Sequence, residues 1–464
     1  MLSSANLFLD NLVVWLEDNF SNQLRYSIFY SFIIHCYTLI KSKAEYLSGS
    51  NFHKLIGFAN ILLIAFFSLS LGLPQFASDK GYFGLIVVFG FVLALTNSLI
   101  KKDYDFKFVI VDFLVLTYFA INIISTFASA YFIPSLNGLA KLVIFIMSYF
   151  WFRLTLNAKN RFFIVNEIIL LAFIMSVYGI YQYKTGVKAL ATWEDPTLDI
   201  HQTRIFSTLG NPNLLAGFLT PILFLNLAFL ANGLNKKNIL QTIVYLISAL
   251  IIFMAVVFTG CRGVYLALPI SLFLIFSVLY IVLIRNLSLN KIVVSTSILV
   301  GLTLCCCFFV MKIPYVKDRF STIFSGREHS SNSYRLNVWQ ASLKMVKDNY
   351  VFGIGPGNKT FRLAYGLYMK SGYDALGTYC VPLEITVEDG IFGLIVFIVL
   401  IKFYLLKLHK QFWTQLSQNN NINWFILGLV GAILAMIFHG FVDTVFFRPQ
   451  INFIFWLLLC LNLD

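Results

Sequence analysis

About twelve long apolar stretches run along the chain, and they limit its possible folds more than any other feature. Each is close to the roughly 20 residues that a helix needs to cross a bilayer, and open sheets cannot pair their backbone groups in lipid. Hydrophobic residues make up 59% of the sequence and charged residues only 12%, too little polar surface for a soluble domain. The sequence therefore predicts an all-α, polytopic membrane protein with spans at 56–73, 82–100, 108–130, 137–155, 163–182, 212–232, 239–260, 264–284, 292–312, 391–408, 424–443 and 446–462.

One hydrophilic segment interrupts this pattern between the ninth and tenth spans. It divides the chain into an N-terminal segment (1–55), a nine-helix region (56–312), a large loop (313–390) and three C-terminal spans (391–464). The apolar stretch 26–40 is too short for a full crossing and suits an interfacial helix.

Within the loop, apolar residues recur at steps of three and four, which predicts an amphipathic helix over 333–349. Ser333 is the expected N-cap. Arg335 then lies in the first turn, where the helix dipole disfavours a positive charge, so we expect Arg335 to have another role.

The connections between the spans alternate in charge, and one side carries most of the Lys and Arg residues, such as Lys101, Lys102, Arg153 and Lys159. By the positive-inside rule this side is cytoplasmic. We therefore expect both termini in the cytoplasm and the large loop outside the plasma membrane. The net charge of +13 follows largely from this bias. No basic soluble unit is visible, so nucleic acid is not an expected partner.

Four arginines lie on the predicted outer side, against the general trend: Arg204, Arg262, Arg335 and Arg448. The guanidinium fork suits phosphate and carboxylate groups. Each arginine alone is equally well explained by a contact with lipid headgroups or with a nearby acid. Their gathering on one side favours an anion site.

Two pairs of ionisable residues are spaced four apart near the same side. Glu384 and Glu388 form either a solvated mouth or a proton-handling pair. His439 and Asp443 lie near the end of the eleventh span, where ionisable groups are candidates for function. The alternative for the second pair is a structural hydrogen bond between the two side chains.

The glycine-rich turn from Gly353 to Gly357 can present backbone N–H groups to an anion, although a plain loop is the simpler interpretation. A disulfide between Cys261 and Cys380 is conceivable, because both fall on the predicted outer side. No cysteine or histidine spacing suggests a metal site.

Taken in order, these motifs resemble the O-antigen ligase and polymerase superfamily, and within it the cyanobacterial Ict family, described as inorganic-carbon (bicarbonate) transporters. The resemblance runs from about residue 50 to the end of the chain. The ending Gly440 to Pro449 is most similar to the Ict branch. The motifs are Arg204 with Gly210-Asn-Pro-Asn213, Thr259-Gly-Cys-Arg-Gly263, Tyr334-Arg-Leu-Asn-Val-Trp339 with the glycine-rich turn, and Leu383 with Glu388-Asp-Gly390.

The resemblance implies a metal-independent transferase with no cofactor, which moves a glycan from a polyprenyl-diphosphate lipid to an envelope acceptor. It implies that Arg204, Arg262 and Arg335 hold the diphosphate. The superfamily's histidine, thought to deprotonate the acceptor, is replaced here by Tyr379, and Cys380 stands where the ligases have Asn. A phenol is almost fully protonated near pH 7 and is a poor base. Glu384 or Glu388 is the alternative base.

Three functions therefore remain open: a glycosyl transferase, a transporter or transport accessory for a small anion such as bicarbonate, and a non-catalytic binder of glycan lipids. A carrier is expected to show paired broken helices near the midplane. The sequence shows no glycines or prolines at matching places in two halves. It favours a ligase-like protein whose partners are the lipid bilayer and an anionic, lipid-linked glycan.

Overall fold

The computed structural model describes residues 52–73, 80–101, 106–187, 204–284, 330–419 and 421–463. The expected interfacial stretch 26–40 and the expected ninth span, 292–312, lie outside these residues. The described helices are α3 (Phe52–Ser70), α5 (Lys80–Ile100), α6 (Ile110–Ala128), α7 (Phe132–Thr155), α8 (Arg161–Thr185), α9 (Pro212–Asn235), α10 (Ile239–Phe258), α11 (Arg262–Ile284), α14 (Ser330–Asp348), α15 (Asn358–Tyr365), α16 (Val381–Asn419), α17 (Trp424–Gly440) and α18 (Pro449–Cys460), with a 3₁₀ turn, η3 (Val445–Phe447).

The all-α membrane architecture is confirmed. Among the described residues, nine helices are long and apolar enough to cross a membrane, and α17 and α18 are shorter apolar helices. The expected twelfth span, 446–462, is too long, because η3 and Pro449 delay the start of α18. With 12 residues, α18 rises only about 18 Å.

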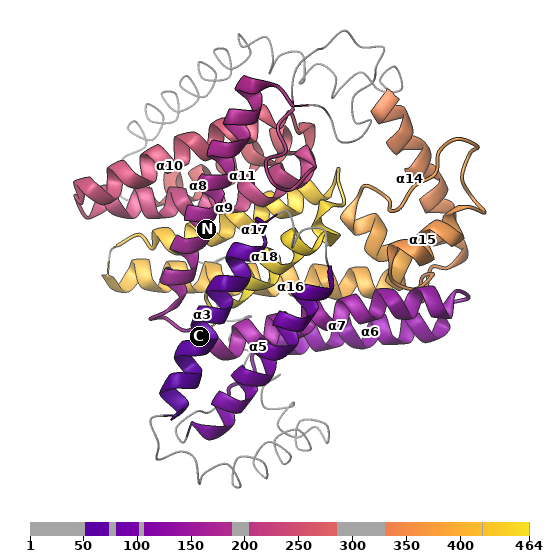
Figure 1. Ribbon diagram of the computed structural model, residues 1–464, viewed down its shortest axis with the longest axis horizontal. Coiled ribbons are helices and arrows are strands. Elements are labelled where there is room, and N and C mark those ends of the chain that lie inside the picture. Colours follow the sequence, from indigo (N-terminus) through magenta and orange to yellow (C-terminus); the bar gives the residue numbers. More distant parts are fainter. Residues whose placement is uncertain are drawn as a thin grey trace.

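The helices form a bundle with α14 and α15 at one end, which we call the loop end (Figure 1). The hairpin of α6 and α7 reaches this end and packs against the glycine-rich turn. A Cβ added at Gly138 of α7 would lie 2.0 Å from the carbonyl oxygen of Pro356, so only glycine permits this approach. The hairpin therefore supports the loop segment directly.

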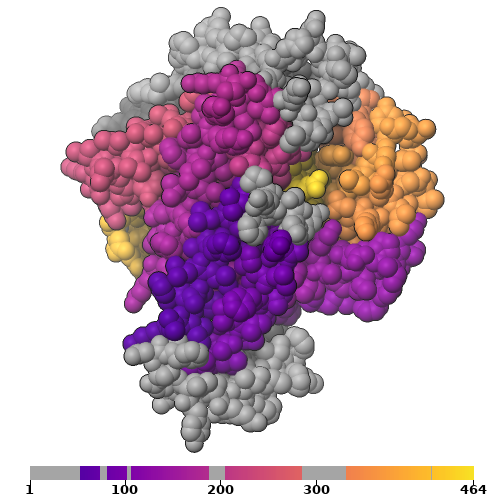
Figure 2. Space-filling view, in the orientation of Figure 1, coloured from indigo at the N-terminus to yellow at the C-terminus, as the bar shows by residue number. Residues whose placement is uncertain are grey.

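The interior and the lipid-facing surface differ as expected for a membrane bundle. Helix α18 is buried from Gln450 to Cys460, and α9 is buried over most of its length. By contrast, α10 and α11 expose large apolar side chains such as Leu250 and Phe273. In the space-filling view, part of the yellow C-terminal segment lies at the base of a hollow beside the orange loop residues (Figure 2).

Helix α16 is broken at Gly390, where φ is +69°. A Cβ there would lie 2.1 Å from the carbonyl oxygen of Val351, and the N–H of Ile391 donates to Tyr350 O at 2.9 Å. The first nine residues of α16 thus belong structurally to the loop end, and the rest of the helix crosses the bundle.

The amphipathic helix in the loop is confirmed, but its predicted start is wrong. Helix α14 begins at Ser330, so Ser333 is not its N-cap and Arg335 lies in the second turn. The argument from an unfavourable first-turn charge therefore no longer applies to Arg335.

Candidate functional site

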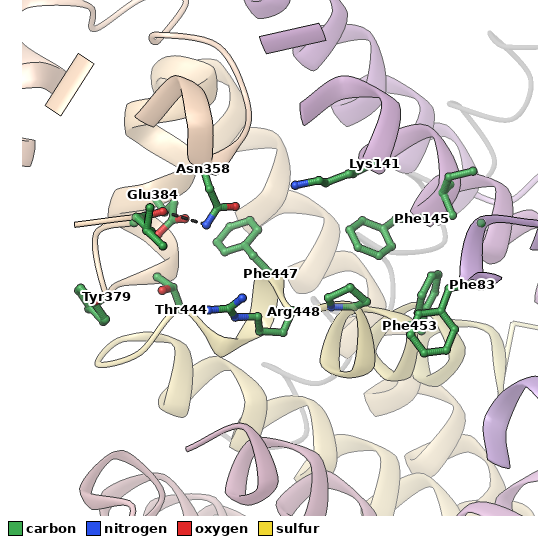
Figure 3. A pocket seen from close by; sticks show the side chains of 15 residues that line it. Phe83, Lys141, Phe145, Asn358, Tyr379, Glu384, Thr444, Phe447, Arg448 and Phe453 are labelled. Carbon is green, nitrogen blue, oxygen red and sulfur yellow. Dashed lines mark hydrogen bonds between the residues drawn. The ribbon is translucent and has the colours of Figure 1, made fainter. Parts of the chain in front are cut away.

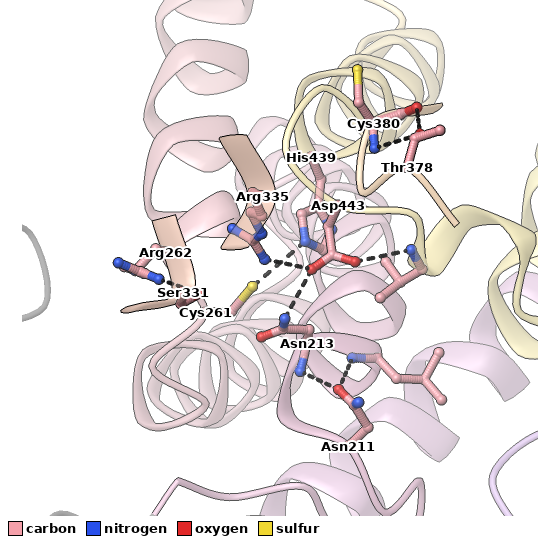
Figure 4. A network of polar contacts seen from close by, with 12 residues as sticks. Asn211, Asn213, Cys261, Arg262, Ser331, Arg335, Thr378, Cys380, His439 and Asp443 are labelled. Carbon is pink, nitrogen blue, oxygen red and sulfur yellow. Dashed lines mark hydrogen bonds and ion pairs between the residues drawn. The ribbon is translucent and has the colours of Figure 1, made fainter. Parts of the chain in front are cut away.

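Two of the predicted arginines are joined through Asp443 at the loop end. Arg204 donates to Thr259 O at 2.9 Å and to Asn213 Oδ1 at 2.8 Å. Asn213 Nδ2 donates to Asp443 Oδ2 at 2.8 Å, and the same oxygen lies 3.3 Å from Nη2 of Arg335 (Figure 4). Residues far apart in sequence thus form one polar network.

The third arginine, Arg262, shares a cavity with Arg335. Arg262 Nη2 donates to Ser331 Oγ at 2.9 Å, which ties the start of α11 to α14 (Figure 4). The cavity has a volume of about 230 Å³ and is also lined by Trp339 and Val442. We call it the arginine cavity. Two forked cations beside an aromatic face suit an anion attached to a larger group.

Local sequence explains why these side chains meet. The side chain of Asn211 caps α9 by accepting from the N–H groups of Asn213 and Leu214, and Pro212 occupies the first turn. Gly260, with φ +61°, ends α10 and allows α11 to begin at Arg262. Both short turns bring polar side chains to the loop end.

Arg448 lines a second cavity, of about 180 Å³, which we call the aromatic cavity. Lys141 and Arg448 lie on opposite sides of it with the ring of Phe447 between them, and the rings of Phe145 and Phe453 lie to one side of both cations (Figure 3). The centroids of these two rings are 5.0 Å apart. Arg448 is therefore set apart from the arginine cavity, although sequence reasoning had grouped the four arginines together.

The two glutamates of α16 have different environments. Glu384 lines the aromatic cavity, and its Oε2 accepts from the backbone N–H of Thr378 at 2.8 Å. Glu388 Oε1 accepts from the N–H of Gly357 at 2.9 Å. Both are buried rather than forming a solvated mouth. Of the two glutamates, Glu384 lines the aromatic cavity, whereas Glu388 lines neither the aromatic cavity nor the arginine cavity.

The N–H groups of Ile354, Gly355 and Gly357 in the glycine-rich turn are bound by the protein itself and not left for an anionic ligand. The N–H groups of Ile354 and Gly355 donate to the carbonyl oxygens of Val387 and Glu388, each at 2.9 Å. The N–H of Gly357 binds the Glu388 carboxylate. The plain-loop interpretation is correct: this turn fastens the loop to α16.

Tyr379 lies between the two cavities. Its ring is 5.9 Å from Cζ of Arg335 on one side, and it lines the aromatic cavity on the other. Its φ of +57° is uncommon for a bulky residue, which indicates that the surrounding contacts fix its position. Burial raises the pKa of the neighbouring Tyr334 phenol. The phenol therefore stays protonated, and Tyr334 can act as a hydrogen-bond donor but not as a base.

His439 and Asp443 do not form the expected structural pair. The His439 ring packs where Cβ atoms at Gly217 and Gly263 would stand, and its Nε2 lies 3.5 Å from Cys261 Sγ. The Asp443 side chain binds Asn213, Arg335 and the N–H of Val445 instead. His439 therefore joins three helices, and Asp443 belongs to the arginine network.

The conceivable disulfide is not formed. Cys261 and Cys380 are free, and the thiol of Cys261 is committed to its contact with His439. Within the described residues, no group of three or more His, Cys, Asp and Glu side chains is placed to hold a metal ion.

Sequence reasoning missed Asn213, Ser331 and Lys141. Asn213 lies inside a motif that it had singled out, and only the fold shows that its side chain bridges Arg204 and Asp443. Lys141 is a cation within the expected span 137–155, and an ionisable residue inside a span is a functional candidate. That signal could have identified Lys141.

Comparison with known proteins supports the ligase resemblance over part of the chain. Residues 247–398 match the family described as O-antigen ligase. The match includes Arg262, Arg335, Tyr379 and both α16 glutamates, while Gly440 to Pro449, on which the expected likeness to the Ict branch rests, lie beyond it. A search of curated proteins gave no match. Over residues 247–398, this polytopic membrane protein is therefore similar to O-antigen ligases.

Proposed function

We propose that the protein binds a polyprenyl-diphosphate-linked glycan at the loop end and transfers the glycan to a hydroxyl group of an envelope acceptor. The loop end then faces the outside of the plasma membrane, as the charge bias predicts. The observation that carries the proposal is the arginine cavity, where Arg262 and Arg335 meet beside Trp339. Arg204 supports this cavity through Asn213 and Asp443.

In the proposed reaction, the acceptor oxygen attacks the anomeric carbon of the donor. The bond from that carbon to the diphosphate oxygen breaks, and the polyprenyl diphosphate leaves with the electron pair. The acceptor proton passes to a carboxylate, for which Glu384 is the candidate because it borders the aromatic cavity. The arginines stabilise the charge of the leaving diphosphate.

The two cavities suit two substrates. Tyr379 separates them, so a diphosphate in the arginine cavity and an acceptor in the aromatic cavity would approach each other at this residue. Aromatic rings together with Asn358, Glu384 and two cations are typical of surfaces that bind sugars by stacking and hydrogen bonding.

The direct test is turnover by the purified protein in liposomes that contain a polyprenyl-diphosphate-linked oligosaccharide and an extract of envelope glycolipids. We expect release of polyprenyl diphosphate that depends on the extract, measured by mass spectrometry. Donor binding without release would identify a non-catalytic binder. Uptake of labelled bicarbonate above that of empty liposomes, without release, would identify a transporter.

A matched pair of variants tests the assignment of the base. Glu384→Gln is expected to lower turnover by about 100- to 10,000-fold, the usual contribution of a general base, with donor affinity unchanged. Glu388→Gln keeps an oxygen that can accept from Gly357 and is expected to lower turnover only a few-fold. Tyr379→Phe retains the ring beside Arg335 and is also expected to have a small effect. Equal turnover by Glu384→Gln and the wild type would exclude Glu384 as the base.

A further inference from the structure

A third cavity, of about 440 Å³, lies at the end of the bundle opposite the loop end. It is enclosed by the ends of α5 and α7, the segment before α6, and part of α3, α16 and the C-terminal turn. Along α7, Arg153 is 15 residues from Gly138, which corresponds to about 22 Å. The third cavity is therefore separate from both the arginine cavity and the aromatic cavity.

Four cations line the cavity: Lys101, Lys107, Arg153 and Lys407. None of its described lining residues is acidic. A concave surface with charges of one sign concentrates the opposite charge. We call it the basic cavity.

The two inner cations are held in fixed positions. Arg153 Nε lies 3.4 Å from the buried carboxylate of Asp112, and its Nη2 donates to Lys107 O at 3.2 Å. Lys407 Nζ donates to Leu463 O at 2.9 Å. Lys101 and Lys107 are exposed at the rim. A ligand would therefore meet two half-buried charges and two exposed ones.

One lining residue of the basic cavity has a polar side-chain atom that forms no hydrogen bond with the described residues. The hydroxyl of Thr155 is buried and has no hydrogen-bond partner among the described residues. A buried hydroxyl without a partner is uncommon in a native structure. Thr155 lines the cavity two positions after Arg153 in α7.

We propose that the basic cavity binds the phosphate group of an anionic lipid. The choice of a lipid follows from the rim, where Gly57 and Ile61 of α3 line the cavity while the neighbouring Phe58 and Leu62 are exposed and apolar. An acyl chain can lie along this face of α3 while its headgroup enters the cavity. Basic pockets between membrane helices on the cytoplasmic side have this character. The proposal is independent of the transfer reaction.

The test is titration of the purified full-length protein in nonionic detergent with phosphatidylglycerol, phosphatidylcholine or inorganic phosphate, followed by thermal unfolding and native mass spectrometry. We expect phosphatidylglycerol alone to bind saturably and to raise the unfolding temperature. The double variant Lys101→Gln/Lys107→Gln changes only exposed side chains and is expected to weaken this binding about tenfold or more.

Lys159→Gln/Lys236→Gln is the control, because it removes the same charge from exposed positions that do not line the basic cavity. Equal weakening by both double variants would show general surface attraction and overturn the proposal. Unchanged lipid binding by Lys101→Gln/Lys107→Gln would overturn it as well. Displacement of the lipid by millimolar inorganic phosphate would assign the cavity to free phosphate instead of a lipid.

Discussion

Replacing Arg335 by alanine is expected to lower glycan transfer by about 100- to 1000-fold, the effect of losing one preorganised donor to a developing negative charge. Arg335 is the residue that connects the arginine cavity to Tyr379 and Asp443. Release of polyprenyl diphosphate and donor affinity are the measurements. Lys344→Ala, on the exposed side of the same helix, is the control and is expected to retain full activity.

Asp443→Asn separates an anion-binding role of Arg335 from a purely structural one. An asparagine has one acceptor oxygen, so it can keep the bond from the N–H of Val445 or the bond from Asn213 but not both, and it no longer pairs electrostatically with Arg335. If Arg335 binds diphosphate, Asp443→Asn keeps or raises donor affinity, because a competing negative charge is gone. If Arg335 only holds Asp443 in place, Asp443→Asn and Arg335→Ala reduce activity equally.

A large loss of stability is expected from Gly353→Ala. Gly353 has φ +70°, and a Cβ there would lie 2.3 Å from the carbonyl oxygen of Glu388. The backbone conformation costs about 1 kcal/mol and the overlap roughly 1–3 kcal/mol more. The unfolding temperature in detergent is expected to fall, together with activity, because the glycine-rich turn fastens the loop to α16.

Gly372→Ala is the matched control for this substitution. Gly372 also has a positive φ, of +84°, but a Cβ there meets nothing within 4 Å. Gly372→Ala therefore carries the free-energy cost of a positive φ without a steric overlap of its Cβ. We expect it to lower stability less than Gly353→Ala. Equal losses for both alanines would mean that the close approach to Glu388 is unimportant.

Much of the fold could be predicted because bilayer thickness imposes a length on each apolar stretch. The expected spans at 82–100 and 239–260 correspond to α5 and α10 within a few residues. The twelfth span was predicted to start too early because Phe446 and Phe447 are apolar yet belong to the 3₁₀ turn η3, and hydropathy alone cannot distinguish such a turn from a helix. The start of α14 was missed because Ser330, Ser331 and Ser333 are all plausible caps.

The site was less predictable than the fold. Motif order suggested that Arg204, Arg262 and Arg335 lie together, and Arg204 and Arg335 do meet through Asn213 and Asp443. Spacing along a helix could not show that His439 turns to Cys261 while Asp443 turns to Arg335. Such choices depend on which neighbouring helix presents a partner, and that information is absent from local sequence.

The shortness of α18 has a consequence for the position of Arg448. The far end of the helix is fixed where Arg161 donates to Leu461 O at 3.1 Å and to Asn462 Oδ1 at 2.9 Å. The 12 residues of α18 rise about 18 Å from this anchor, and this length sets the level at which Arg448 borders the aromatic cavity. The Arg448 side chain is exposed there, so an anionic guest can reach its guanidinium group without displacing any part of the bundle.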